Sequence, residues 1–197
     1  MWSEKYRPQI ISDMVGNEEP RAAIMEWFAK WKKGTKPLLL VGPPGIGKTT
    51  MAYLVAKQFG YDMIGLNASD VRSKSRINEI LTPVLGNVSV LGIPMIFVDE
   101  VDGIHGRGDY GGAAALVDIL KEPTVPIVLA ANDDSLEKMK NIKKVVKTIS
   151  FKRIPPRLLR VYLENILKKE SVKLSPGSLI KVIDKSRGDI RSMINLT

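Results

Sequence analysis

Eight consecutive residues combine the types that bind phosphate groups. Residues 42–49 read GPPGIGKT and match the pattern G-x-x-x-x-G-K-S/T, between a short apolar run over 37–41 and a helical pattern over 47–59. Glycines let backbone N–H groups turn toward phosphate oxygens, and a helix N-terminus adds partial positive charge. Lys48 can reach the β- and γ-phosphates of a nucleotide, and the Thr49 hydroxyl can hold Mg²⁺. The segment predicts a nucleoside triphosphate site.

Two acidic residues follow a second apolar run. Residues 95–98 are all apolar and lead directly into Asp99 and Glu100, 51 residues after Lys48. A carboxylate at the end of a neighbouring strand can hold Mg²⁺ or its waters, which is the role we assign to Asp99. Glu100 would orient or deprotonate an attacking water. The pair predicts phosphoryl transfer to water.

Two further polar residues fit the same site. Asn132 follows an apolar run over 125–131, where its amide can position the water or touch the γ-phosphate, although asparagine at such a place is often only turn chemistry. Residues 132–135 read NDDS and not the Asn-Lys-x-Asp of guanine-specific GTPases, so we favour ATP over GTP. Arg191 lies in the first turn of the last predicted helix. Its side chain either points toward a phosphate group of the nucleotide or is one exposed arginine among many.

The elements that position these residues alternate along the chain. Apolar patterns predict helices over 21–33, 47–59, 73–85 and 111–121, and strands over 37–41, 62–66, 93–98, 125–131 and 146–151. This alternation predicts an α/β fold, a five-stranded parallel sheet flanked by helices. After Phe151 only helical patterns remain, opened by Pro155-Pro156, by Ser175-Pro176 and by Asp189. We therefore expect an α/β domain over 1–153 and a small all-helical lid domain over 154–197.

Composition excludes several classes of site. The 197 residues contain no cysteine and one histidine, His105, which excludes disulfides, cysteine-bound zinc, iron–sulfur clusters and thiol catalysis and disfavours a Ser-His-Asp triad. No apolar run approaches the roughly 18 residues of a membrane span, and residues 1–8 do not resemble a signal peptide. We expect an intracellular, cytoplasmic protein without a membrane partner. The last predicted helix runs into Thr197, so we expect the chain to be a fragment of a longer protein.

The charge is unevenly distributed. The net charge is +9, yet residues 138–197 hold 16 Lys and Arg against 4 Asp and Glu, whereas residues 1–137 have a net charge of −3. Such asymmetry indicates either a polyanionic partner or a solvated lysine-rich surface.

Taken together, these motifs resemble the AAA+ ATPases, P-loop NTPases with a helical lid. Within them the chain is most similar to replication factor C, the clamp loader, on segments 4–8, 13–17, 66–70 and 188–191. Three details resemble its archaeal large subunit: Ile46 in the phosphate loop, a glycine-rich stretch over 103–112, and no Ser-Arg-Cys near 141–146. The last implies that the chain receives an arginine finger from a neighbour and provides none of that type.

The resemblance also implies ligands and partners. ATP and Mg²⁺ are the implied cofactors, held by Thr49 and Asp99 for the metal and, for the nucleotide, by Tyr6, Arg7, Pro8, Val15, Gly16, Gly42, Pro43, Pro44, Gly45, Ile46, Gly47, Lys48, Thr49 and Thr50. The implied catalytic residues are Lys48, Glu100, Asn132 and Arg191. The implied DNA contacts are Arg72, Lys74 and Arg76, although a solvated basic helix start explains them equally well.

The function implied is that of an ATPase subunit that loads a sliding clamp onto primed DNA. Its partners would be clamp-loader small subunits, the sliding clamp and primer–template DNA bound without sequence preference. Without a neighbour's arginine we expect slow hydrolysis. A nucleotide-binding scaffold with negligible hydrolysis and a hexameric AAA+ DNA motor are the alternatives.

Overall fold

The computed structural model of this chain describes residues 2–67, 70, 71, 73–86, 92–104, 111–135, 137 and 139–197, with the backbone alone at 82, 83, 85 and 86. Arg72 and residues 105–110 of the glycine-rich stretch, which the sequence analysis singled out, lie outside these ranges.

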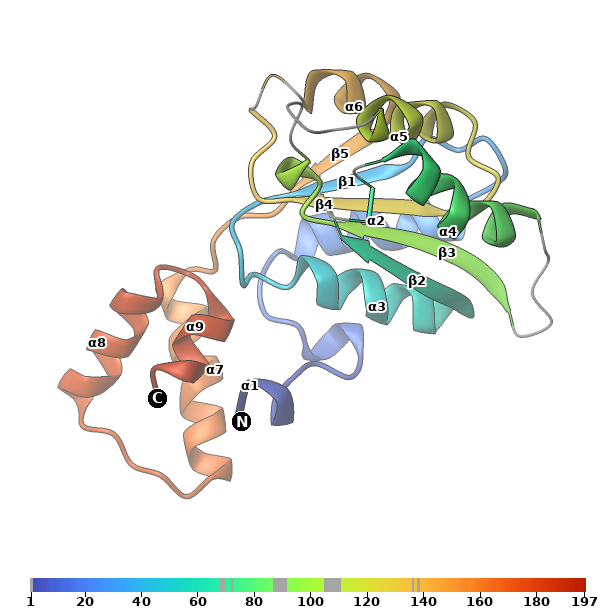
Figure 1. Ribbon diagram of the computed structural model, residues 1–197. Helices are drawn as coiled ribbons and strands as arrows, with labels where there is room; N and C mark the ends of the chain where they lie inside the picture. The colour runs from blue at the N-terminus through green and yellow to red at the C-terminus, as the bar shows by residue number, and fades with distance from the viewer. Residues whose placement is uncertain are drawn as a thin grey trace.

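A five-stranded parallel sheet forms the centre of the larger lobe (Figure 1). Its strands are β1 (Leu38–Val41), β2 (Tyr61–Asn67), β3 (Ile93–Asp99), β4 (Ile127–Ala131) and β5 (Lys147–Ser150), in the order β2-β3-β4-β1-β5. Every pairing is parallel, so all strands end at the same edge, where Asn67 pairs with Asp99 in the register. The predicted five-stranded parallel sheet is confirmed.

Helices cover both faces of this sheet because successive strand residues point to opposite sides. Leu38 and Leu40 of β1 join one buried cluster with α2 (Glu18–Ala29) and α3 (Lys48–Phe59). Leu39 and Val41 join the other, with α4 (Lys74–Gly86), α5 (Gly112–Lys121) and α6 (Met139–Val145). Figure 1 shows these two helical layers below and above the strands.

Three helices form the smaller lobe, the lid, drawn in orange and red in Figure 1: α7 (Pro156–Lys169), α8 (Pro176–Ser186) and α9 (Ile190–Asn195). Leu159, Leu163 and Met193 are fully buried in its core. The predicted caps are present, since the side chains of Ser175 and Asp189 accept hydrogen bonds from the backbone N–H groups of Ser178 and Ser192. Residues 151–155 connect β5 to α7, and the boundary between 153 and 154 remains our proposal.

The amino-terminal segment contacts both lobes, and its Ile11 and Met14 pack against the buried cluster that contains α2 and α3. It contains α1 (Trp2–Lys5) and a 3-10 turn, η1 (Ile11–Asp13), and Figure 1 shows α1 beside α9 of the lid. Trp2, Tyr6 and Val15 pack against the buried cluster of the lid. The beginning and the end of the chain are therefore joined in one lobe.

The elements differ from the sequence predictions at a few points. α2 spans Glu18–Ala29, whereas the sequence predicted a helix over 21–33. The helix begins earlier than predicted because Pro20 lies in its first turn, where proline is compatible with a helix. α6 was not predicted, since only Met139 and Ile142 of its seven residues are buried. α9 ends at Asn195, with Leu196 as its C-cap, and does not run on to Thr197.

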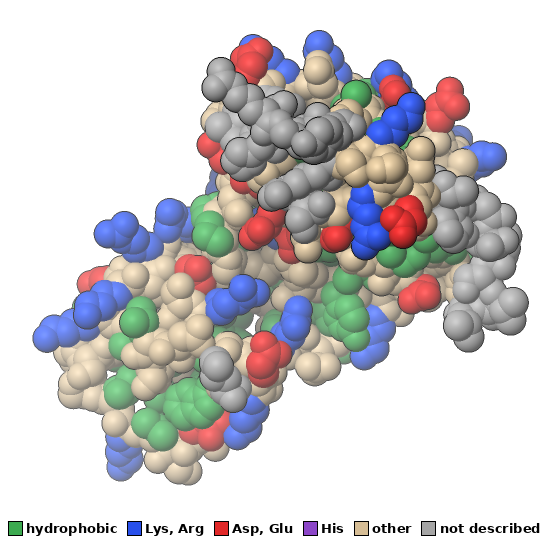
Figure 2. Space-filling view, viewed as in Figure 1, with side chains coloured by type: hydrophobic (Ala, Val, Ile, Leu, Met, Phe, Trp, Pro, Cys, Tyr) green, Lys and Arg blue, Asp and Glu red, His purple; other side chains and the backbone are tan. Residues whose placement is uncertain are grey.

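The basic residues of the last third spread over the surface of the lid and α6. On the face drawn in Figure 2, Lys and Arg side chains lie scattered around the lid lobe, at the lower left. Several are paired with acids: Arg160 with Glu164 at 2.8 Å and Lys143 with Asp134 at 2.7 Å. Within the described ranges, no helix combines the length and the apolar character needed to cross a membrane.

Candidate functional site

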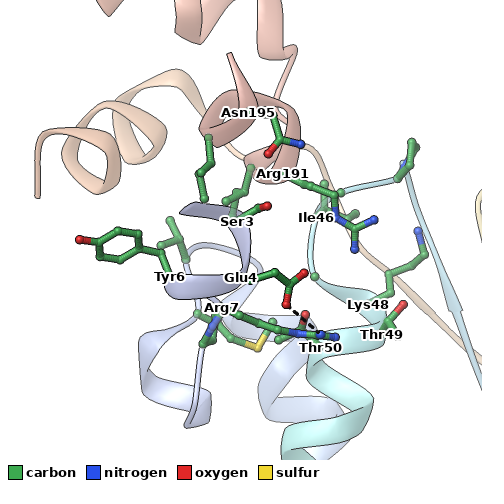
Figure 3. A pocket seen from close by; sticks show the side chains of 18 of the residues that line it. Ser3, Glu4, Tyr6, Arg7, Ile46, Lys48, Thr49, Thr50, Arg191 and Asn195 are labelled. Carbon is green, nitrogen blue, oxygen red and sulfur yellow. Dashed lines mark ion pairs between the residues drawn. The ribbon is translucent and has the colours of Figure 1, made fainter. Parts of the chain in front are cut away.

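A cavity of about 520 Å³ lies at the edge where the strands end, between the sheet, the lid and the amino-terminal segment. Figure 3 shows side chains around it from the amino-terminal segment, from the phosphate loop with the start of α3, and from α9 of the lid. Among the predicted residues, those that line it are Tyr6, Arg7, Pro8, Val15, Pro44, Gly45, Ile46, Gly47, Lys48, Thr49, Thr50, Asp99, Glu100, Asn132 and Arg191. The structure thus brings together residues separated by almost the whole chain.

The phosphate loop connects β1 to α3, and its glycines have the backbone angles that the turn requires. Gly45 and Gly47 have φ of +69° and +97°, in the left-handed region that disfavours side chains. Gly47 is the N-cap of α3, so Lys48 and Thr49 open the helix. The loop therefore directs the N-terminus of α3 into the cavity, as the sequence predicts.

Lys48 is buried, with 7% of its surface exposed, and its ammonium group donates three hydrogen bonds. The acceptors are the carbonyl oxygens of Gly42 at 2.6 Å and Pro43 at 2.9 Å, and Oδ1 of Asn132 at 3.1 Å. Burial lowers the pKa of Lys48 from its usual value, while the nearby carboxylates, Asp99 first, act in the opposite direction. Gly42 and Pro43 are not among the residues that line the cavity, but their carbonyls hold the lysine that does.

Thr49 and Asp99 meet as the motif requires. The Thr49 hydroxyl donates to Oδ2 of Asp99 at 2.8 Å, joining α3 to the end of β3. A hydroxyl and a carboxylate suit Mg²⁺, which takes oxygen ligands, keeps several waters and needs few protein groups. Among the described residues, no group of three or more His, Cys, Asp or Glu side chains could hold a metal ion. The Thr49–Asp99 pair fits magnesium when nucleotide phosphates supply further oxygens.

Glu100 has an unusual backbone. Its φ of +53° and ψ of +41° place a non-glycine residue in the left-handed region, which is uncommon and costs energy. Its side chain is exposed and lines the cavity, one residue beyond Asp99. This turn separates the two acids, so that Asp99 faces Thr49 while Glu100 is free to meet water.

Asp102 contacts the end of the neighbouring strand and was not singled out from the sequence. It lies in the 3-10 turn η2 (Val101–Gly103), and its Oδ2 accepts hydrogen bonds from the backbone N–H groups of Asn132 at 3.1 Å and Asp133 at 3.2 Å. Its position just after the Asp99-Glu100 pair was the only signal for it in the sequence.

The lid reaches the phosphate loop through the start of α9. The N–H of Ile190 donates to the carbonyl of Gly45 at 3.1 Å, and a Cβ added at Gly45 would overlap the Asp189 carboxylate. Arg191 follows in the first turn of α9, and Figure 3 shows its side chain extending toward Ile46 and Lys48. The predicted approach of this arginine to the phosphate loop is present; its role remains a prediction.

The amino-terminal segment forms the opposite wall. Arg7 lies 4.0 Å from Glu4 in an ion pair, drawn as a dashed line in Figure 3. The Tyr6 hydroxyl donates to Glu170 at 2.6 Å, at the end of α7, and Figure 3 shows its ring pointing away from the phosphate loop. Gly16 does not line the cavity; its carbonyl accepts a hydrogen bond from Arg21, and it packs against Ile154.

Several lining residues were missed by the sequence reasoning: Ser3, Glu4, Asp13, Met14, Tyr162, Ile190, Ile194 and Asn195. Glu4, Asp13, Met14 and Ile190 belong to the segments that carry the clamp-loader resemblance, which was the available signal. Tyr162 gives no such signal, because its hydroxyl donates to the carbonyl of Tyr6, 156 residues away, at 2.9 Å.

The predicted DNA contacts lie elsewhere. Lys74 and Arg76 are exposed in the first turn of α4 and do not line the cavity. Arg76 pairs with Glu79 at 2.9 Å. Their role stays a prediction.

Comparisons with known proteins indicate the family of this chain. The family described as "ATPase family associated with various cellular activities (AAA)" matches residues 38–171. The replication factor C large subunit of Thermofilum pendens is 42% identical over 199 residues, covering 98% of this chain and 48% of that protein. Replication factor C subunit 1 of Saccharomyces cerevisiae is 35% identical over 225 residues, covering 100% and 26%. The chain thus spans about half the length, or less, of these curated relatives.

Solved structures show the same fold at low sequence identity. The Thermotoga maritima RuvB Holliday junction branch migration motor superposes with a TM-score of 0.71 at 17% identity, covering 96% of this chain and 63% of that one. The AAA family model matches most of the chain, and the chain has the phosphate loop and the strand that ends in Asp-Glu. We conclude that the chain belongs to the AAA family of ATPases.

Proposed function

We propose that this chain binds ATP with Mg²⁺ and hydrolyses it in the cavity between the sheet, the lid and the amino-terminal segment. One observation carries the proposal. Lys48 of the phosphate loop and Asn132 of β4 are hydrogen-bonded, and Thr49 is hydrogen-bonded to Asp99 of β3. Three separate motifs thus meet at the strand ends, which supports a site for phosphoryl transfer.

Each residue has a role that follows from its chemistry. Lys48 exchanges the neutral carbonyls of Gly42 and Pro43 for negatively charged β- and γ-phosphate oxygens, a stronger interaction because both partners are then charged. Glu100 accepts a hydrogen bond from the attacking water and takes up its proton, and the Asn132 amide orients that water or the γ-phosphate. Arg191 stabilises negative charge from the lid side.

Thr49 and Asp99 would hold Mg²⁺ through the hydroxyl and the carboxylate that now contact each other. Bound there, the metal neutralises phosphate charge that would otherwise repel the nearby carboxylates.

We further propose that the protein is a subunit of a clamp loader that opens a sliding clamp and places it on primed DNA in the cytoplasm. The support is similarity to replication factor C large subunits over 98% of this chain. Residues 141–146 contain lysines but no arginine, which supports a subunit that receives an arginine finger from a small subunit. Lys74 and Arg76 would contact DNA phosphates.

The test is reconstitution with clamp-loader small subunits, a sliding clamp and primer–template DNA, followed by measurement of ATP turnover. Stimulation by clamp and DNA together, lost in Glu100→Gln, supports the proposal. A flat, near-zero rate with normal ATP binding indicates a nucleotide-binding scaffold. Translocation along DNA by a homohexamer indicates a motor.

A further inference from the structure

We propose that Asp102 is a positioning residue that holds Asn132 in place for hydrolysis by fixing the backbone at the end of β4. This inference rests on the proposed ATPase function. It differs from the roles given above, because Asp102 does not line the nucleotide cavity.

The first step is the contact itself. One carboxylate oxygen of Asp102 accepts from two consecutive backbone N–H groups, those of Asn132 and Asp133. These amides follow Ala131, the last residue of β4, so no strand pairing continues through them. A charged acceptor shared by two adjacent amides fixes the direction in which the chain leaves the strand. Asp102 thereby sets the orientation of the Asn132 side chain.

The second step is what Asn132 holds in turn. Its Oδ1 accepts a hydrogen bond from Lys48, so a continuous path runs from η2 through β4 to the phosphate loop. Asp99 is the last residue of β3, and Asp102 lies three residues later in η2. The residue assigned to the metal and the residue that holds Asn132 are therefore joined by a short segment, and movement of this segment would displace both.

The third step concerns the second oxygen of the carboxylate. The second oxygen of Asp102, Oδ1, is buried and has no hydrogen-bond partner among the described residues. A buried carboxylate oxygen without a hydrogen-bond partner is costly, so it calls for a specific explanation. The cost is understandable if the carboxylate is retained because its other oxygen, Oδ2, holds the backbone at Asn132 and Asp133.

The experiment compares Asp102→Ala with Asp102→Asn, which keeps an acceptor oxygen for the two amides. Asp118→Ala, which removes an exposed carboxylate paired with Lys121 on α5, is the matched control. We expect Asp102→Ala to lower the single-turnover rate of ATP hydrolysis about 10- to 100-fold, the usual range for misplaced catalytic groups, with ADP affinity changed less than about threefold. Asp102→Asn should recover most of the rate.

Two further measurements separate positioning from general damage to the fold. Hydrogen exchange at the amides of Asn132 and Asp133 should be at least about tenfold faster in Asp102→Ala and near normal in Asp102→Asn. In the double variant with Asn132→Ala, the loss should equal that of Asn132→Ala alone, because the two residues act as one unit.

The outcomes are distinct. A protein that binds ATP but never hydrolyses it, even with its partners, contradicts the proposed function. Unchanged amide exchange in Asp102→Ala overturns this inference whatever the activity. So does a double variant in which the two losses multiply.

Discussion

The ammonium nitrogen of Lys48 lies 3.1 Å from Oδ1 of Asn132, which joins the phosphate loop to the end of β4 across 84 residues of sequence. The other two donors of Lys48 are bound to loop carbonyls. All three ammonium hydrogens therefore have partners within the protein, and a phosphate must replace some of them. The side chain is thus held ready at the site without an exposed, unpaired charge.

Replacing Lys48 by alanine should weaken ATP binding by about 100-fold, since charge-assisted hydrogen bonds to phosphate contribute about 1.5–3 kcal/mol each. Fluorescence titration with a labelled ATP analogue measures the change. Lys57→Ala is the matched control, because Lys57 is exposed in the last turn of the same helix. Equal losses in both variants would contradict a specific role for Lys48.

Replacing Glu100 by glutamine should leave ATP affinity nearly unchanged and lower the hydrolysis rate by about 10²–10⁴-fold, the usual contribution of a general base. The amide keeps the size of the side chain but takes up no proton. Rapid-quench measurement of phosphate release tests this, with Glu122→Gln, an exposed residue at the end of α5, as the control. If Glu100→Gln hydrolysed ATP at the normal rate, the general base would have to be another residue.

Gly45→Ala should separate the lid from the phosphate loop. Its new methyl group would overlap the Asp189 carboxylate that caps α9. Gly60→Ala is a close control, because Gly60 has a similar φ of +73° but nothing within 4 Å of an added Cβ. Both variants pay about 1–2 kcal/mol for a left-handed alanine, measured by chemical denaturation. Only Gly45→Ala should also lose ATP affinity, and equal affinities would show that the contact is unimportant.

The contact of Glu170 with Lys5 and Tyr6 should weaken in acid. Hydrogen bonds from Lys5 and then Tyr6 hold the pKa of Glu170 below its usual value. A lowered carboxyl pKa means that this stabilisation is present at neutral pH and above, and is lost as the pH falls through the folded-state pKa. The indole resonance of Trp2, which packs on the lid core, should shift over that acidic range. In Glu170→Gln this acid-dependent shift should be absent; a shift of the same size would point to another group.

If Lys74 and Arg76 contact DNA phosphates, each should contribute to the salt dependence of the affinity for DNA. Removing one phosphate contact lowers the slope of log affinity against log salt by about 0.9 for duplex DNA. The double alanine variant in the reconstituted complex should therefore lose nearly two units of slope, equally for all sequences. Lys121→Ala on α5 is the control. An unchanged slope would assign these residues to the solvated surface.

The sequence predicted the parts of the site that depend on short, ordered motifs. The phosphate loop, the Asp99-Glu100 pair and Asn132 each follow an apolar strand, and parallel strands must end at one edge. The caps at Ser175 and Asp189 were also predictable, because capping depends on neighbouring residues.

Contacts between distant residues could not be predicted in this way. Tyr162 meets the carbonyl of Tyr6, and Glu170 meets Lys5, because the amino-terminal segment packs on the lid. The two hydrogen bonds that Asp102 accepts depend on how far β3 and β4 extend relative to each other. The register between the two strands determines this, and the local sequence pattern does not. The sequence did not predict α6 because a short, lysine-rich helix shows little periodicity of apolar residues.

The packing of the amino-terminal segment on the lid has a mechanical consequence. Tyr6 is tied to α7 by Tyr162 and Glu170, whereas Arg191 belongs to α9 of the same lobe. A rotation of the lid would therefore displace Tyr6 and Arg191 together, and the cavity that both residues line would change in width. A probe attached near Lys5, whose side chain contacts Glu170, could follow that rotation.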